Sequence, residues 1–322
     1  MYSKFLEVSK ETGVSVKKIL DVFFLLSTGE SIDNTKLLQK VGVSKNVLNQ
    51  IKQSLSSLLK PVSKDTQLNT EGLNKIKQLY PKGFASEEEL WSILEDDQFK
   101  DIVKLFQSVR KKQPLPKREY DQFTATTETT ARRASLLSFF GDVKEKKLLF
   151  LGDDDFTSVA TASLKEAEKI VAVDIDERIL GEIQGLSNNH GFEIETVKYD
   201  ARKKLPKELI GVFDVVFTDP PYTPEGFNLF ISRAIEALDP NNKAARVYAC
   251  YGNSDGAKER FLPIYEVLTN SGLMMRWVFD KFNKYQGAES IGSSSSLFVT
   301  EITSRIKSTI KGDYDKPIYT NS

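Results

Sequence analysis

Residues 146–159 of the chain read KKLLFLGDDDFTSV, an apolar run that ends in Gly152 and continues into three consecutive carboxylates, Asp153, Asp154 and Asp155. In nucleotide-binding α/β proteins the turn at this point is usually rich in glycine, so that the backbone and a helix N-terminus can approach an anionic group. Three adjacent carboxylates instead repel a phosphate or a substrate carboxylate and attract a cation. The loop therefore predicts a ligand that is positively charged where it faces the loop.

A second motif lies in residues 212–226, VFDVVFTDPPYTPEG, where an apolar strand runs into Asp219, two prolines and Tyr222. An Asp-Pro-Pro-Tyr turn after such a strand is typical of S-adenosylmethionine-dependent enzymes that modify amine nitrogens. Each proline lacks an N–H and has a restricted φ, so the turn is stiff and directs a carbonyl and an aromatic ring at one point. We therefore expect Asp219 or the carbonyl of Pro220 to hold a nitrogen nucleophile, with Tyr222 beside it. An ordinary strand-ending turn is the alternative.

The spacing between the two motifs is that of a doubly wound α/β sheet. Residues 169–180, KIVAVDIDERIL, predict a second strand ending at Asp174, and residues 192–206 predict a third strand ending at Asp200. An acidic residue about twenty positions after the first loop is placed to bind the ribose hydroxyls of a nucleoside, so Asp174 is the candidate. The alternative is that Asp174 or Asp176 only caps the next helix. Asp200 is a weaker candidate for binding the exocyclic amine of adenine.

Four stretches together resemble the branched-chain polyamine synthases: YDQFTATTETTARR at 120–133, GDDD-x-T-S at 152–158, VDIDER at 173–178 and TDPPYTPEG at 218–226. The resemblance covers roughly residues 110–285. It implies an aminopropyltransferase that acts on spermidine, with decarboxylated S-adenosylmethionine as donor. It also implies an N-terminal winged-helix domain followed by a Rossmann-like catalytic domain of the methyltransferase type. In this resemblance the last Asp of GDDD, Asp155, acts on the attacking amine.

The chemistry of this reaction agrees with the acidic loop. The decarboxylated donor presents a sulfonium and an ammonium and no anion, and a polyamine is itself a polycation. Carboxylates offset the repulsion between the two, and one of them must accept a proton because only a neutral amine can attack. Crowding of the three carboxylates is expected to raise at least one pKa toward neutrality. We therefore assign catalysis to Asp155, Asp219 and Tyr222, and binding of the co-substrate to Gly152, Asp153, Asp154, Asp174, Asp200 and Pro220.

Two other functions remain open at this stage. One is methyl transfer from S-adenosylmethionine to an amine of nucleic acid or protein, and the other is a DNA-binding regulator that senses polyamines. A methyltransferase of this kind needs a glycine-rich turn near the methionine carboxylate, whereas GDDDFTS has one glycine and three opposing charges. Aminopropyl transfer is therefore favoured. The acceptor, the number of groups added and the linear or branched form of the product stay undecided.

The first eighty residues differ in charge from the rest of the chain. They contain twelve lysines and seven acidic residues, a net charge of +5, so that the remainder carries −5. Helical spacing at 15–26, 33–41 and 44–59 predicts a helix-turn-helix with Ser44 as an N-cap, and residues 61–70 resemble a wing. The third helix could enter a major groove with Lys45, Asn46, Asn49, Gln50 and Gln53. Dimerisation or covering of the active site is favoured over DNA binding, which we expect to be at most non-specific and salt-sensitive.

We therefore divide the chain into a winged-helix domain (1–80), a helical connector (81–117), a catalytic domain (118–306) and a flexible tail (307–322). Within the catalytic domain, 273–282 and 294–301 predict a closing antiparallel pair of strands. The tail lacks a periodic apolar pattern, so we expect it to be loosely ordered. It is also short and mixed in charge, whereas the resembled family has a longer acidic C-terminus, so no acceptor preference carries over.

The composition limits the remaining possibilities. The single cysteine, Cys250, allows no disulfide within the chain, which fits a reducing cytoplasm. No signal peptide and no apolar run of about eighteen residues is present, so we expect no membrane span. Three neighbouring carboxylates cannot all turn inward at once, and the lone His190 lies in a turn-like stretch, so we expect no metal and no cofactor beyond the co-substrate. A homodimer is the expected assembly.

Overall fold

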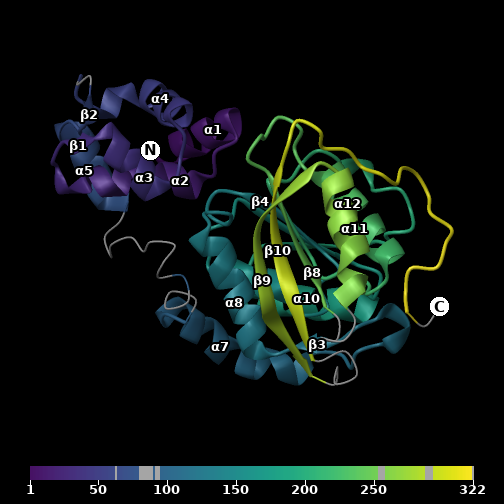
Figure 1. Ribbon diagram of the computed structural model, residues 1–322. Coiled ribbons are helices and arrows are strands. Elements are labelled where there is room, and N and C mark those ends of the chain that lie inside the picture. The colour runs from purple at the N-terminus through teal and green to yellow at the C-terminus, as the bar shows by residue number, and fades with distance from the viewer. Residues whose placement is uncertain (62–63, 80–89, 91–94, 253–257, 287–292, 321–322) are drawn as a thin grey trace. The chain divides into compact units, whose positions relative to one another are not determined.

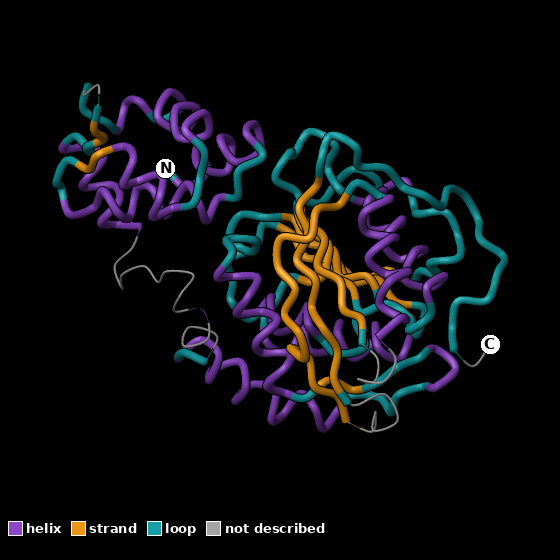
Figure 2. The backbone as a smooth tube through the Cα atoms, viewed as in Figure 1, coloured by secondary structure: helices purple, strands orange, loops and turns teal. Residues whose placement is uncertain are grey.

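The computed structural model describes residues 1–61, 64–79, 90, 95–252, 258–286 and 293–320. The chain divides into two compact units, which Figures 1 and 2 trace along the chain. Unit 1 comprises residues 1–93 together with the short segments 139–141 and 241–244, and unit 2 comprises the rest. Residues 81–89 and 91–94 of the predicted connector at 81–117 lie outside the described residues.

Unit 1 is a small helical unit with a two-stranded sheet (Figure 1). Its elements are α1 (Tyr2–Thr12), α2 (Val16–Leu25), β1 (Ile32–Asp33), α3 (Asn34–Val41), α4 (Lys45–Ser54), β2 (Asp65–Thr66) and α5 (Thr70–Leu79). Strands β1 and β2 pair antiparallel, and an antiparallel bridge joins Leu59 to Leu68. One apolar cluster built around Phe5, Ile19 and Phe23 holds the helices together. Burial of this cluster, more than helix propensity, stabilises such short helices.

The predicted helix-turn-helix is present as α3 and α4. The carboxylate of Asp33 caps α3 by accepting hydrogen bonds from the backbone N–H groups of Thr35 and Lys36. Gly42 ends the helix with φ 68°, a conformation that glycine adopts without strain. The Ser44 hydroxyl then accepts a hydrogen bond from the N–H of Val47, which confirms the predicted N-cap. Assignment of the whole unit as a winged helix stays a prediction.

Unit 2 is built on an eight-stranded sheet, which confirms the predicted methyltransferase-type doubly wound fold. The strands are β3 (Thr124–Ala125), β4 (Lys147–Leu151), β5 (Lys169–Asp174), β6 (Ile194–Lys198), β7 (Val215–Thr218), β8 (Arg246–Tyr251), β9 (Leu273–Gln286) and β10 (Ser294–Ile302), in the spatial order β3-β9-β10-β8-β7-β4-β5-β6. The five strands β4 to β8 are parallel. Strand β10 lies antiparallel between β8 and β9, and β9 and β10 form the predicted closing pair.

Helices cover this sheet because its parallel strands are apolar on both faces. The helices of unit 2 are α7 (Asp97–Val109), α8 (Thr127–Phe139), α9 (Thr157–Ala162), α10 (Glu177–His190), α11 (Pro224–Ala237) and α12 (Leu262–Asn270). Helices α9 and α10 pack against β5 and β6, while α11 packs against β7 and β8 and also against α12. Every residue of β7 and β8 is buried. No helix among the described residues is long and apolar enough to cross a membrane.

The tail that follows β10 differs from the expected loose segment. It runs in an extended path, drawn in yellow in Figure 1, and is held by long-range hydrogen bonds. The buried Arg233 donates to the carbonyl of Gly312, and Ile318 is only 1% exposed. Both the N–H and the hydroxyl of Thr320 donate to the carboxylate of Asp121. An extended strap held by such contacts has no apolar periodicity, so the pattern gave no sign of its order.

Candidate active site

The carboxyl ends of three neighbouring strands, β4, β5 and β7, bring the predicted acidic residues to one edge of the sheet. There they border a cavity of about 550 Å³, part of which is open to solvent. In open α/β sheets this edge is where ligands bind. The lining residues are Tyr120, Asp121, Gln122, Leu151, Gly152, Asp154, Val173, Asp174, Ile175, Tyr199, Ala201, Asp219, Pro220, Pro221, Phe230 and Tyr319. Four carboxylates and no basic residue occur among these described lining residues.

The first carboxylate of the acidic turn, Asp153, faces the following helix. Gly152 has φ 72°, and this turns the chain so that Asp153 lies at the start of α9. Its carboxylate accepts hydrogen bonds from the backbone N–H of Thr157 at 2.8 Å and of Ser158 at 3.1 Å. Burial raises the pKa of Asp153 to about 7, although these hydrogen bonds act in the opposite direction. Because its carboxylate is bound by the amides of α9, Asp153 is not one of the residues lining the cavity.

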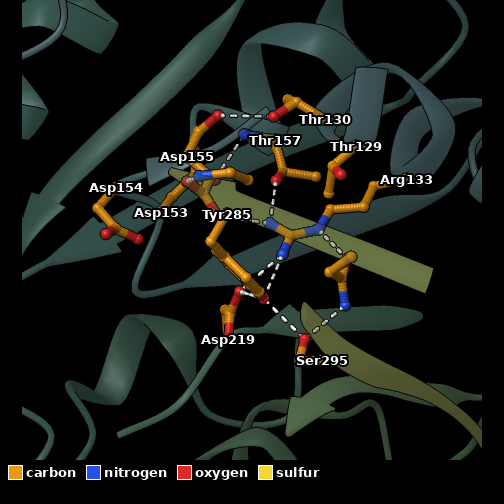
Figure 3. A network of polar contacts seen from close by, with 12 residues as sticks. Thr129, Thr130, Arg133, Asp153, Asp154, Asp155, Thr157, Asp219, Tyr285 and Ser295 are labelled. Atoms are coloured by element: carbon orange, nitrogen blue, oxygen red, sulfur yellow. Dashed lines mark hydrogen bonds and ion pairs between the residues drawn. The ribbon is translucent and has the colours of Figure 1, made fainter. Parts of the chain in front are cut away.

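The second carboxylate, Asp154, does line the cavity. It is half-buried, and no described residue donates a hydrogen bond to its side chain. In Figure 3 its carboxylate points away from the polar network that surrounds Arg133. Burial, followed by the nearby carboxylates of Asp155, Asp174 and Asp219, raises the pKa of Asp154 well above its usual range. The group thus favours a bound proton or a bound cation.

The third carboxylate, Asp155, is buried and bound by protein groups, and its expected role toward the attacking amine stays a prediction. It is 2% exposed and forms an ion pair of 2.8 Å with Arg133 from α8. Its other oxygen accepts a hydrogen bond of 2.6 Å from the N–H of Ala125. Both oxygens of Asp155 are therefore engaged by the protein, inside the network of Figure 3.

Arg133 also reaches the second motif. Its guanidinium, from a residue 1% exposed, forms an ion pair of 2.7 Å with Asp219 and donates hydrogen bonds to Asn283 and Tyr285. The hydroxyl of Tyr285 donates to the same oxygen of Asp219 at 2.6 Å. A buried guanidinium stays charged, and its separate N–H groups donate here to two different carboxylates. Arg133 therefore ties the acidic turn after β4 to the Asp-Pro-Pro turn after β7.

The predicted ribose ligand, Asp174, lines the cavity, and the alternative capping role falls to its neighbour. Asp176 is the N-cap of α10 and accepts a hydrogen bond from the N–H of Arg178. Asp174 accepts hydrogen bonds from the backbone N–H groups of Asp153 at 3.0 Å and of Asp176 at 2.8 Å. Burial raises the pKa of Asp174 to about 6. These contacts fix the carboxylate at the cavity wall.

Besides Asp153 and Asp155, two further predicted site residues, Asp200 and Tyr222, are absent from the described lining. Asp200 pairs with Arg202 at 2.8 Å, and its neighbours Tyr199 and Ala201 border the cavity instead. The ring of Tyr222 packs edge-on against Phe123 with centroids 5.8 Å apart. The remaining predicted contacts, Gly152 and Pro220, do line the cavity.

Several residues of the site were not predicted. Arg133 and Asp121 lie inside the stretch 120–133 that carries part of the resemblance, but no role was assigned to them. Tyr285 comes from β9, and Tyr319 comes from the tail, where its ring packs on Tyr120 with centroids 5.7 Å apart. The only signal in the sequence was a pair of adjacent arginines in an otherwise Thr- and Ala-rich segment, of which Arg133 is the second. Its partners lie 22 and 86 residues away, so spacing could not identify them.

Comparison with known proteins places these features in a family. The model of the branched-chain polyamine synthase A C-terminal domain matches residues 101–315. An uncharacterised protein of Methanocaldococcus jannaschii is 34% identical over 97% of this chain and 80% of its own length. The N(4)-bis(aminopropyl)spermidine synthase of the same organism is 34% identical over 58% of this chain and 53% of its own length. The chain thus aligns with about half the length of that synthase.

Solved structures agree with the fold. The branched-chain polyamine synthase of Thermus thermophilus, determined in complex with N4-aminopropylspermidine and 5′-methylthioadenosine, superposes with a TM-score of 0.63. The match covers all of this chain and 98% of that chain at 20% sequence identity. With the domain match and the acidic and Asp-Pro-Pro-Tyr turns at one sheet edge, the chain belongs to the branched-chain polyamine synthase family.

Proposed function

We propose that this chain transfers an aminopropyl group from decarboxylated S-adenosylmethionine to an amine of spermidine or a related polyamine, releasing methylthioadenosine. The observation that carries the proposal is the lining of the cavity, in which four carboxylates and no described basic residue border the space. S-adenosylmethionine brings a carboxylate that needs a cation or a free helix N-terminus. Here the amides at the start of α9 already bind Asp153. The decarboxylated donor lacks that group and suits the acidic surface.

The proposed donor position follows from the cavity wall. Asp174 would accept hydrogen bonds from the ribose hydroxyls, as acidic residues at this strand end do in nucleoside-binding sheets. The sulfonium and ammonium of the donor would then lie toward Asp154 in the acidic turn and Asp219 in the Asp-Pro-Pro turn, which both line the cavity. The Thermus thermophilus relative was solved with methylthioadenosine and an aminopropylated polyamine, and this supports a nucleoside and a polyamine sharing one cavity.

The reaction requires one proton acceptor. The lone pair of the neutral amine attacks the carbon beside the sulfonium, and the C–S bond breaks with its electron pair staying on sulfur. A carboxylate takes the amine proton, so that charge and atoms balance. We assign this role to Asp154, because it lines the cavity without a hydrogen-bond donor from the described protein. Asp155, whose oxygens both bind protein groups, becomes a positioning residue.

The second turn would hold the acceptor. Arg133 and Tyr285 fix one oxygen of Asp219, while the residue still borders the cavity. The amine could then be bound through Asp219 and the carbonyl of Pro220. Binding of two cationic substrates would favour the ionised form of Asp154, whose pKa is raised by burial and by nearby carboxylates. This gives a base that is charged when the substrates are present.

Mass spectrometry of products tests the function. The purified full-length chain is incubated with either donor and with spermidine, spermine or putrescine. We expect mass gains of aminopropyl units on a polyamine, together with methylthioadenosine, only with the decarboxylated donor. Methyl transfer from S-adenosylmethionine to a protein or nucleic-acid substrate, without aminopropylated product, would replace the proposal by the methyltransferase alternative.

A further inference from the structure

The basic character of unit 1 is concentrated in one stretch. Residues 34–64 contain α3, α4 and the segment that connects α4 to β2. They hold six lysines and no acidic residue. Five of these lysines, Lys36, Lys40, Lys45, Lys60 and Lys64, are exposed. None of the five forms an ion pair with another described residue. Soluble surfaces ordinarily mix charges of both signs, so a continuous basic stretch indicates an anionic partner.

The exposed faces of the two helices have a uniform chemistry. On α4 the exposed residues are Lys45, Asn46, Asn49, Gln50 and Gln53, which fall within an arc of roughly 140° at 3.6 residues per turn. On α3 they are Thr35, Lys36, Gln39 and Lys40, within an arc of about the same width. Both arcs contain only lysines, amides and one hydroxyl. The opposite faces, with Leu37, Leu48 and Ile51, belong to the apolar core.

We propose that this surface binds duplex DNA through its phosphates, with α4 in the major groove. Lysines are the groups that neutralise phosphates, and Asn and Gln side chains can donate to and accept from base edges. A helix fits the wide major groove of B-form DNA, whereas the major groove of an RNA duplex is too deep and narrow to admit one. The absence of Arg from this stretch indicates binding with little sequence preference. The activity is separate from the proposed aminopropyl transfer.

The scaffold supports such docking. The side chains of Asp33 and Ser44 accept hydrogen bonds from backbone N–H groups in the first turns of α3 and α4, and so fix where the two helices begin. The backbone N–H of Asn34 donates to the carbonyl of Lys64, which joins the start of α3 to the segment before β2. The backbone of Lys64 therefore lies beside the N-terminus of α3, while the N–H of Lys60 donates to the carbonyl of Gln67. A basic segment beside a helix-turn-helix is a common contact to the DNA backbone.

The test measures fluorescence anisotropy of a labelled 20-base-pair DNA duplex with the full-length chain, from 50 to 200 mM salt. Up to five phosphate contacts predict a slope of log K against log salt of about −4.5. The triple variant Lys36→Gln, Lys40→Gln, Lys45→Gln should reduce the slope to about −2 and weaken binding at 50 mM salt by about tenfold or more. All three positions are exposed, and an unchanged thermal unfolding curve checks that folding is intact.

A matched control removes the same charge elsewhere. Lys4→Gln, Lys77→Gln, Lys104→Gln changes three exposed lysines outside the stretch. It should leave both affinity and slope within twofold of the parent. Equal weakening by the control, absence of binding at 50 mM salt, or equal or tighter binding of an RNA duplex of the same sequence would each overturn the proposal.

Discussion

The three carboxylates of the acidic turn have three different surroundings, and each is expected to respond differently to substitution. Asp153 binds helix amides, Asp155 binds Arg133, and Asp154 faces the cavity. We predict that Asp154→Asn lowers turnover by about two to four orders of magnitude, the usual contribution of a general base, with a smaller effect on donor affinity. Steady-state kinetics at saturating donor measure this loss.

Asp155→Asn is the comparison that separates the two roles. It keeps the size of the side chain but weakens the ion pair with Arg133, so it should lower both stability and turnover and leave the pH profile of turnover unchanged. If Asp155→Asn removes a titrating group from that profile while Asp154→Asn retains near-normal turnover, the base is Asp155, as the family resemblance implied.

Asp174 provides a second residue-scale prediction. Its carboxylate is fixed at the cavity wall by two backbone N–H groups and is proposed to hold the ribose. Asp174→Ala should weaken donor binding by about 1–3 kcal/mol, the range for charge-assisted hydrogen bonds. Isothermal calorimetry measures the dissociation constant. An unchanged constant would remove Asp174 from the donor site.

At the scale of elements, Arg133 joins α8 to the turns after β4 and β7. Replacing it by Met leaves Asp155 and Asp219 buried without their common partner. We expect a loss of about 3–5 kcal/mol in the free energy of unfolding, as found when one member of a buried ion pair is removed. Chemical denaturation measures the loss. Arg133→Lys should restore part of it, because the charge returns without the separate guanidinium N–H groups that donate to Asp155 and Asp219.

The neighbouring Arg132 is the matched control on the same helix. It is more exposed and pairs with Glu95 at the surface. Arg132→Met should cost about 1 kcal/mol or less, as exposed pairs do. Equal losses for the two variants would show that α8 itself is sensitive, and that the bridge between the turns adds nothing.

The elements of the sheet could be predicted because apolar runs ending in acidic residues mark the strands and their carboxyl ends. The direction of each carboxylate in the turn could not be predicted. It depends on the positive φ of Gly152 and Phe156 and on a partner, Arg133, that only the folded chain brings near. The order of the tail was missed for the same reason, since Thr320 binds Asp121 across 199 positions.

At the scale of the whole molecule, charge is distributed between the two units. The first eighty residues carry +5 and the remainder −5, and in unit 2 four carboxylates gather around one cavity. Sequence composition identified this separation, whereas which carboxylates meet depended on the topology of the sheet. The acidic cavity makes donor binding a function of pH.

We predict that the affinity for the donor rises with pH through about 6, the pKa to which burial raises Asp174. Below this value the group is a neutral acid, and above it the carboxylate attracts the sulfonium and ammonium. The raised pKa of Asp154 extends the rise to higher pH. Calorimetry in two buffers of different ionisation enthalpy should detect protons released on binding. Asp174→Asn should flatten the lower part of the profile, and a flat profile in the parent would contradict the prediction.

We infer that the acidic cavity selects a donor without a carboxylate. The most direct measurement compares the dissociation constants of decarboxylated S-adenosylmethionine and S-adenosylmethionine for the same protein at pH 7.5. We expect the decarboxylated donor to bind at least about tenfold tighter, since one like-charge contact removed is worth on the order of 1.4 kcal/mol or more. Equal or tighter binding of S-adenosylmethionine would contradict the claim.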